Sequence, residues 1–219
     1  MPTRGVTASL EEVAASDLLD PSQITAKERY ELMTSIVAPR PIGWLSTWGD
    51  SGIPNLAPFS YFGALSVSPM LVGVSIGERR DGLKDTLLNI RHQGAFCANL
   101  VSASLLVPMN ESSLTAEPDV DEFVVSGLHS ASSNLVDAPF VSECPAVFEC
   151  VVQQEVDLQG APNALIIGEV VGVRLSPDLD FEDGSRRIRP ETLRPVGRLG
   201  GSAYSVVDVV QRLKRPDHR

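Results

Sequence analysis

The chain has 219 residues, a hydrophobic content of 43% and a formal net charge of −10 at pH 7. This length suits one domain of moderate size with extensions, and the hydrophobic content allows a sizeable core. The negative charge argues against nucleic acid and anionic membranes as partners, and the lack of a long apolar run argues against a membrane span. Because the N-terminus has no signal-peptide apolar core, we expect a cytoplasmic protein.

The chain opens with residues 1–24, which are predicted to be an extension in front of a main domain over residues 25–213. Thr25 and Glu28 form a capping-box pattern, and apolar residues at helical spacing follow them. This pattern predicts a helix, and Pro39 ends it.

Three strand-like apolar runs come next, joined by hairpin signals at 49–52 and 68–69. The second run contains Pro58, which cannot donate to a sheet ladder, so this strand is predicted to lie at a sheet edge or to be bulged. A bulge would leave backbone groups for a ligand. Leucines at helical spacing then predict a helix over 83–90, which Gly94 closes, and a fourth strand follows. The four predicted strands are 41–48, 53–66, 70–76 and 95–101.

The second half of the chain begins with residues 102–143, which are predicted to form helices and loops broken by prolines. Two long strands joined by a turn follow, and in the first of them alternation places Glu149 on a polar face with Gln153 and Glu155. A charged loop, a flexible glycine segment, a helical stripe of valines and a disordered tail complete the chain. The two strands are 145–156 and 164–175, and the charged loop is 176–195. The glycine segment is 197–204, the valine stripe is 206–213 and the tail is 214–219. Strands at short intervals joined by turns favour an antiparallel barrel with flanking helices in a mainly β fold.

The three cysteines are an odd number without CxxC spacing, which is typical of a reducing compartment. If residues 145–156 form one strand, Cys144 and Cys150 lie about 20 Å apart at ~3.3 Å per residue and cannot be bridged. We interpret Cys97, Cys144 and Cys150 as buried free thiols. The three histidines show no metal-ligand spacing, so no metal site is predicted.

A cationic cluster stands out in this acidic chain, because Arg79, Arg80 and Lys84 bracket the start of the predicted helix. Helix N-termini bind anions through their free N–H groups and the helix dipole. A phosphate at this helix start, with a heteroaromatic ring at the strand that contains Pro58, would fit the stretch from Pro39 to Asn99.

Seven motifs occur in the order found in the flavin reductase-like, FMN-binding split-barrel family, and the chain resembles the flavoredoxin-like branch of that family over most of its length. The motifs are PRPIGWLST at 39–47, NLAPFSYF at 55–62, KDTLLNI at 84–90, DVDEF at 119–123, FEC at 148–150, GEVV at 168–171 and GRLGGSAY at 197–204. The resemblance implies a split barrel of Greek-key type that binds FMN. It also implies a homodimer with the flavin near the subunit interface, where the glycine segment or the 102–143 insertion of one subunit completes the site of the other.

The resemblance implies two groups of FMN contacts. Asn55, Ala57 and Ser60 would hydrogen-bond the pyrimidine edge or the ribityl chain, and an ordinary edge strand is the alternative. The phosphate would lie among Ser75, Arg79, Lys84, Asp85 and Thr86. In this second group Lys84 and Thr86 match the family's phosphate contacts, while Asp85 is interpreted as a stabiliser of the helix start. A solvated basic loop is the alternative interpretation of this group. The spacing of the residues does not decide whether Arg79 or Arg80 points toward the phosphate.

Aromatic side chains are a third class of candidate, because they often flank a flavin. Trp44, Trp48 and Tyr204 are candidates for stacking, although in a barrel such residues are more often part of the core. His129 lies in the insertion, where a surface loop is the favoured interpretation over a contact with flavin or substrate.

The sequence contains no GxGxxG after a strand, no P-loop motif and no GxSxG elbow, so the corresponding nucleotide and hydrolase functions are not supported. Hydride transfer through a flavin needs no dedicated acid or base on the protein, and no catalytic residue is assigned. We expect NADH or NADPH to reduce bound FMN, which then reduces a flavin or another small acceptor. An FMN-dependent electron carrier and a non-catalytic flavin-binding protein are the alternatives.

Overall fold

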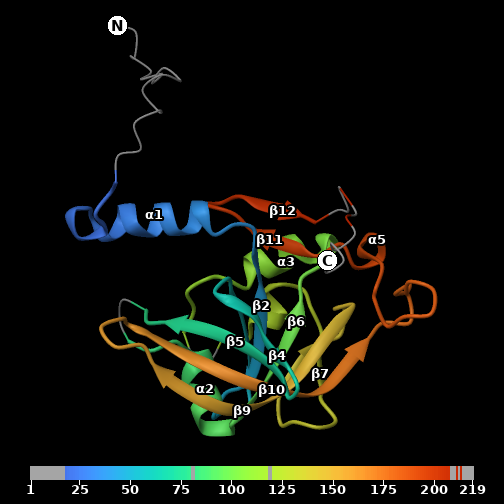
Figure 1. Ribbon diagram of the computed structural model, residues 1–219. Helices are drawn as coiled ribbons and strands as arrows, with labels where there is room; N and C mark the ends of the chain where they lie inside the picture. The colour runs from blue at the N-terminus through green and yellow to red at the C-terminus, as the bar shows by residue number, and fades with distance from the viewer. Residues whose placement is uncertain (1–17, 80–81, 118–119, 208–210, 212, 214–219) are drawn as a thin grey trace, which may run out of the picture.

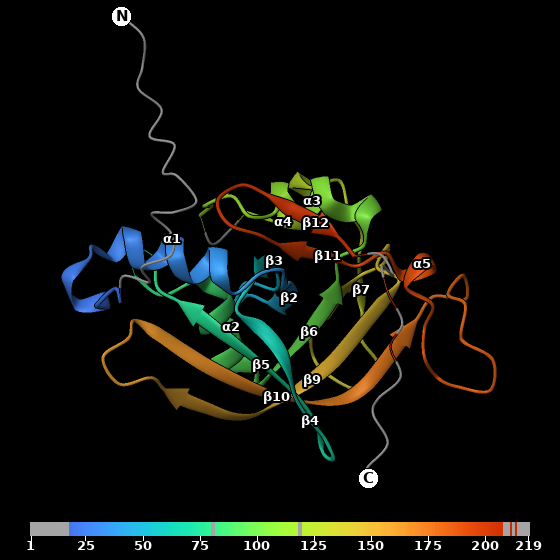
Figure 2. The ribbon, with the colours of Figure 1, turned by 45° about the horizontal axis from the view of Figure 1, so that its top comes forward.

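The computed structural model describes residues 18–79, 82–117, 120–207, 211 and 213. Its main element is a seven-stranded antiparallel sheet with strand order β3-β2-β6-β9-β10-β5-β4. Figures 1 and 2 show these strands curling around the molecule, with helices on the outside. The strands are β2 Gly43–Trp48, β3 Pro54–Phe59, β4 Phe62–Val67, β5 Met70–Gly77, β6 Ala95–Leu100, β9 Ala146–Asp157 and β10 Asn163–Leu175. The mainly β antiparallel barrel with flanking helices is therefore confirmed.

The run 53–66 forms two strands instead of the predicted one, since β3 and β4 are separated at Ser60 and Tyr61. Strand β3 lies at one end of the sheet and pairs with β2 in unbroken register through Pro58. The edge position is therefore confirmed, and the bulge is not present. Proline is tolerated here because only one side of β3 is paired, and its missing N–H faces away from β2.

The two longer helices match their local signals. Helix α1, Ala26–Ile36, has the complete capping box between Thr25 and Glu28. Helix α2, Asp85–Gln93, begins two residues later than predicted and ends at Gly94, whose φ of 66° suits glycine. The shorter elements are η2 Pro21–Gln23, η3 Ala103–Leu105, α3 Leu106–Glu111, α4 Glu122–Val125, α5 Pro190–Leu193 and the hairpin β7 Ser130–Ser132 with β8 Pro139–Val141. None of the described helices is long and apolar enough to cross a membrane.

The glycine segment near the C-terminus forms a hairpin, in which its two ends lie in strands and residues 199–203 connect them. Strands β1 Arg40–Pro41, β11 Val196–Arg198 and β12 Tyr204–Val206 form a three-stranded antiparallel sheet. Val206 therefore lies in a strand, where its β-branched side chain is favoured, and not in a helix. Residues 209 and 210 of the predicted stripe, the predicted tail 214–219 and residues 1–17 of the extension lie outside the described residues.

The core has two parts, and β2 separates them because both of its faces are buried. Trp44 belongs to one cluster and Leu45 to the other. Glu149 is also buried, at 2% exposure, so its predicted place on a polar face is wrong. Its carboxylate accepts hydrogen bonds from Arg174 and from the Leu135 N–H, which offsets the cost of burying the charge.

All three cysteines are free and buried, as predicted. Burial raises the pKa of Cys97 to about 12 and also raises the pKa values of Cys144 and Cys150. A buried thiol with a raised pKa carries little thiolate near neutral pH, so these side chains act as small apolar groups.

Candidate functional site

A cleft of about 470 Å³ lies where β3, the start of α2, residues 109–116 and the β11–β12 hairpin meet. This volume lies within the range of small-molecule sites, which is roughly 300–1,000 Å³. Eight of the ten sequence-predicted contact residues line it. They are Asn55, Ala57, Ser60, Arg79, Lys84, Asp85, Thr86 and Tyr204.

Trp44 and Ser75 do not line the cleft. Trp44 is completely buried, and its Nε1–H donates to the Ser112 hydroxyl at 2.9 Å. Ser112 itself lines the cleft, so Trp44 supports the wall from behind and cannot stack on a ligand. The Ser75 hydroxyl accepts a hydrogen bond from the Asn163 amide at 3.1 Å, within the β5–β10 pairing.

The start of α2 faces the cleft with backbone N–H groups that have no hydrogen-bond partner within the helix. Lys84 is its N-cap residue and provides no side-chain cap, so the N–H groups of Asp85 and Thr86 have no partner within the helix. The Lys84 ammonium lies 5.1 Å from the centre of the Phe59 ring. Among the described residues no carboxylate forms an ion pair with it. Burial, and then the nearby charge of Arg79, lower the pKa of Lys84.

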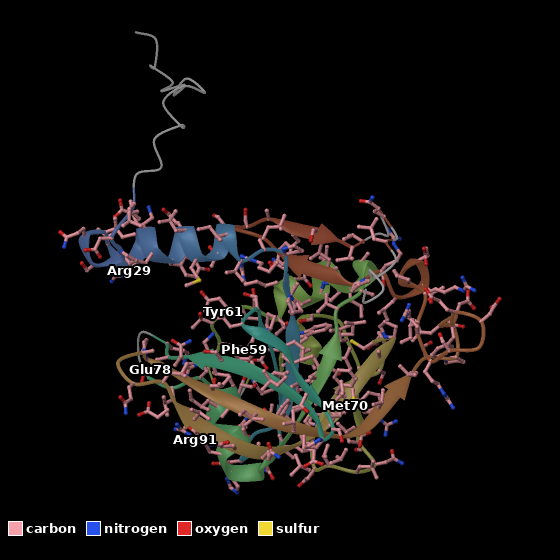
Figure 3. All side chains as sticks on the ribbon, viewed as in Figure 1. Arg29, Phe59, Tyr61, Met70, Glu78 and Arg91 are labelled. Carbon is pink, nitrogen blue, oxygen red and sulfur yellow. The ribbon has the colours of Figure 1, made fainter. Side chains whose placement is uncertain are left out.

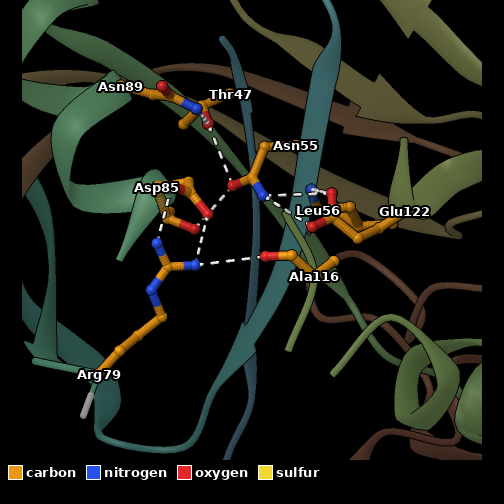
Figure 4. A network of polar contacts seen from close by, with 9 residues as sticks. Thr47, Asn55, Leu56, Arg79, Asp85, Asn89, Ala116 and Glu122 are labelled. Atoms are coloured by element: carbon orange, nitrogen blue, oxygen red, sulfur yellow. Dashed lines mark hydrogen bonds and ion pairs between the residues drawn. The ribbon is translucent and has the colours of Figure 1, made fainter. Parts of the chain in front are cut away.

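Arg79 lines the cleft, and its guanidinium forms an ion pair with Asp85. Its two terminal nitrogens donate to the two Asp85 oxygens at 2.9 and 3.2 Å, and one of them also reaches the Ala116 carbonyl at 3.4 Å (Figure 4). This bidentate pair holds Asp85 in the first turn of α2, where an acidic side chain is favourable. Because the pair is neutral, Lys84 supplies the net positive charge of this end. Arg80 lies outside the described residues.

Asn55 lies at the centre of a polar network beneath the cleft (Figure 4). Its carbonyl oxygen accepts from the Thr86 hydroxyl at 2.7 Å, and its amide nitrogen donates to both oxygens of Glu122 at 3.1 and 3.2 Å. The Leu56 N–H also donates to Glu122, at 3.0 Å. Pro58, two residues along the same edge, has no N–H. Because the strand has no bulge, no backbone groups are freed by one here, and the Leu56 N–H on this edge already donates to Glu122.

Glu122 is a cleft residue that the sequence analysis did not select, although it lies in the DVDEF motif at 119–123. It is only 6% exposed, and burial raises its pKa, against the hydrogen bonds from the Leu56 backbone and Asn55, which lower it. Residues 112–116 were also missed. They match no functional motif in the sequence, and their contribution depends on where the loop lies.

The far wall of the cleft comes from α1 and the β11–β12 hairpin. The Ser60 hydroxyl faces the Arg40 guanidinium at 3.4 Å, and the Tyr204 hydroxyl donates to Asn110 at 3.0 Å. One face of the Tyr204 ring is covered by Arg198. His129 is not part of this wall: it is exposed and contacts Glu143 at 2.6 Å, which confirms the interpretation as a surface residue.

Comparisons with known proteins agree with this architecture. The model of the flavin reductase like domain matches residues 34–190. An uncharacterised protein of Halalkalibacterium halodurans is 36% identical over 203 residues, which cover 90% of this chain and 96% of that protein. The solved nitrilotriacetate monooxygenase component B from Bacillus cereus is 30% identical with a TM-score of 0.86, covering 91% of this chain and 99% of the other.

A second solved structure, the 2-nitrobenzoate 2-nitroreductase of Pseudomonas fluorescens, is 26% identical with a TM-score of 0.81, covering 91% of this chain and 96% of the other. The family match extends over more than half of the chain and includes β2 to β10 and the α2 side of the cleft. The split-barrel expectation is thus confirmed, and the chain belongs to the flavin reductase-like family.

Proposed function

We propose that this protein binds FMN in the cleft and passes a hydride from NADH or NADPH, through that FMN, to a flavin or another small acceptor. The observation that carries the proposal is the uncapped start of α2 with Lys84, at one end of a cleft of suitable size. A phosphate monoester carries close to two negative charges at neutral pH, and helix N–H groups with a lysine are suited to bind it.

The residues present fit FMN in kind. Lys84 and the N–H groups of Asp85 and Thr86 would hold the phosphate. The Thr86 hydroxyl, which now donates to Asn55, can rotate toward a stronger acceptor. Ala57 leaves room beside β3 for a planar ring, while the Glu122 contacts keep the Asn55 side chain in one orientation. FMN supplies the hydride chemistry when bound, and the protein positions it and limits the access of water.

Two further observations support redox chemistry with a small acceptor. Membership of the flavin reductase-like family indicates an oxidoreductase. The two solved relatives are, by name, a monooxygenase component and a nitroreductase. Because Lys84 is the cation without a carboxylate partner among the described residues at the α2 end, and the sequence lacks a Rossmann fingerprint, we favour FMN over FAD.

The proposal includes a homodimer. Helix α1 exposes several apolar side chains, among them Tyr30 at 57%, Met33 at 55% and Ile36 at 77%. Figures 1 and 2 show α1 projecting beside the barrel. Tyr30 also lines the cleft, so a second subunit that covers α1 would close the site at the same time.

The absorption spectrum of the purified protein, taken before and after anaerobic addition of NADH or NADPH, tests the proposal. A bound-FMN spectrum that bleaches with either nucleotide is the expected result. A flavin spectrum that does not bleach would favour an electron carrier or a non-catalytic flavin-binding protein, and photoreduction followed by transfer to a protein acceptor distinguishes these two. Titration with FAD in parallel tests cofactor choice, since FAD binding as tight as FMN binding would contradict an FMN-sized site.

A further inference from the structure

Besides Arg79 and Lys84, the cleft has a third cationic side chain, Arg198 on β11, on the wall formed by the C-terminal hairpin. Its guanidinium lies 4.4 Å from the centre of the Tyr204 ring and donates to the Tyr204 hydroxyl and to the Gly201 carbonyl. The Tyr204 hydroxyl in turn donates to Asn110. Stacking and these two hydrogen bonds hold the guanidinium in one plane, which is the arrangement that favours bidentate recognition of a carboxylate or phosphate.

Arg198 keeps N–H groups for a ligand. Two of its five N–H groups have acceptors among the residues that the structure describes, and both acceptors are neutral. The described carboxylates on the cleft lining are Asp85 and Glu122. Asp85 is paired with Arg79, and Glu122 accepts from Asn55 and Leu56, so neither neutralises Arg198.

The wall behind Arg198 adds to the positive potential. Arg40 is only 5% exposed and lies over the Tyr61 ring, and the hydrogen-bond acceptors of its guanidinium among the described residues are neutral oxygens. These are the carbonyls of Thr34, Val37 and Leu199 and the hydroxyl of Ser60. A buried guanidinium without a carboxylate raises the potential of a nearby cleft, because low-dielectric surroundings screen its charge weakly.

We propose that Arg198 forms a second anion subsite, which binds the carboxylate or phosphate of the molecule that exchanges electrons with the cofactor. The subsite is formed by a different element from the one at Lys84, since Arg198 lies on β11 and Lys84 at the start of α2, and both side chains line the same cleft. This inference rests on the proposed function, and it narrows the substrate class to anionic donors or acceptors. The donor would be held through its phosphates, and the acceptor through a carboxylate.

Equilibrium binding to the FMN-loaded protein tests the subsite without turnover. The probes form two pairs: NAD⁺ with nicotinamide, which lacks the ADP-ribose and with it both phosphates, and benzoate with benzamide, which lacks only the carboxylate charge. Titrations use calorimetry and the shift of the flavin absorption band. The variants are Arg198→Met and, as a control with the same change in net charge, Arg187→Met, whose arginine is exposed on the 176–195 loop beside Glu182.

If the subsite holds the donor, Arg198→Met raises the Kd for NAD⁺ tenfold or more and leaves the Kd for benzoate unchanged. If it holds the acceptor, Arg198→Met raises the Kd for benzoate tenfold or more and leaves the Kd for NAD⁺ unchanged. In both cases nicotinamide, benzamide and FMN bind as before, and Arg187→Met behaves as wild type. Equal losses for charged and neutral probes, or no loss for either anion, would overturn the proposal.

Two further results separate this inference from the proposed function. A selective loss of FMN over riboflavin in Arg198→Met would assign Arg198 to the cofactor phosphate and overturn the separate subsite. A wild-type protein that binds no flavin would overturn the proposed function and the subsite with it, whereas normal FMN binding with an unaffected variant overturns the subsite alone. Should Arg198→Met not fold, Arg198→Lys keeps the charge without the planar fork, and it is expected to weaken the same anion several-fold.

Discussion

Replacing Lys84 by alanine is the most direct test of the phosphate placement. If the ammonium contacts the FMN phosphate, the change removes a charge-assisted hydrogen bond worth roughly 1.5–3 kcal/mol. At about 1.4 kcal/mol per tenfold, the affinity for FMN should fall about ten- to a hundredfold. Riboflavin lacks the phosphate, so its affinity should stay the same.

Folding should survive this substitution. Lys84 has no carboxylate partner among the described residues, so its removal strands no buried charge. The contact of its ammonium with the Phe59 ring, at 5.1 Å, is worth about 0.5–1 kcal/mol, and the relief of an ammonium that burial disfavours opposes that loss. The thermal melt of the apo variant should therefore lie close to that of the wild type.

Arg91→Ala is the matched control, because it removes the same charge from the other end of α2. Arg91 lies in the last turn of α2 and forms an ion pair with Glu155 of β9. Figure 3 shows Arg91 on the side of the molecule away from α1. Parallel titrations with FMN and riboflavin should show a loss only for FMN and only in Lys84→Ala. Equal losses for both flavins, or no loss for either, would refute the placement of the phosphate on this helix.

The pH dependence of FMN binding provides a second measure of the same group. A phosphate binds the protonated lysine, so affinity is full below the pKa of Lys84 and falls as the pH rises through it. Because burial and Arg79 lower this pKa, the fall should begin at a lower pH than for an ordinary lysine. In Lys84→Ala the fall in FMN affinity at this pH should be absent. The same fall in the variant would contradict the assignment of Lys84 to the phosphate.

Three further predictions concern the site, the assembly and the thiols. Glu122→Ala leaves the Asn55 amide and the Leu56 N–H without their acceptor, so thermal unfolding should indicate a loss of about 1–3 kcal/mol, and an unchanged melt would show that water replaces the carboxylate. Sedimentation velocity should give twice the chain mass for the wild type. Met33→Glu places a charge on the exposed apolar face of α1, so this variant should sediment with one chain mass. A wild-type monomer that binds FMN tightly would rule out a site shared between subunits. A disulfide reagent near pH 8 should label Cys97 and the other two thiols only after unfolding, because burial holds them as thiols, and labelling of the native protein would contradict this.

Several features of this protein follow from the sequence because their causes are local. The capping box at Thr25 and Glu28 fixes the start of α1, and Gly94 ends α2 because it adopts a positive φ. The motif around Lys84 likewise places a cation at a helix start. Each signal acts over a few neighbouring residues, so the amino-acid types alone determine the outcome.

Other features required the tertiary structure, because they join residues far apart in the chain. Glu122 meets Asn55 across 67 positions, and Trp44 meets Ser112 across 68. Alternation along β2 could not show that both of its faces are buried, which removes Trp44 from the cleft. Residues 196–198 and 204–206 form strands because β11 pairs with β1 and β12 pairs with β11, and this overrides the helical spacing that begins at Val206. Periodicity reports what a segment prefers alone, whereas packing and pairing with distant segments decide which of its groups are buried and which face a ligand.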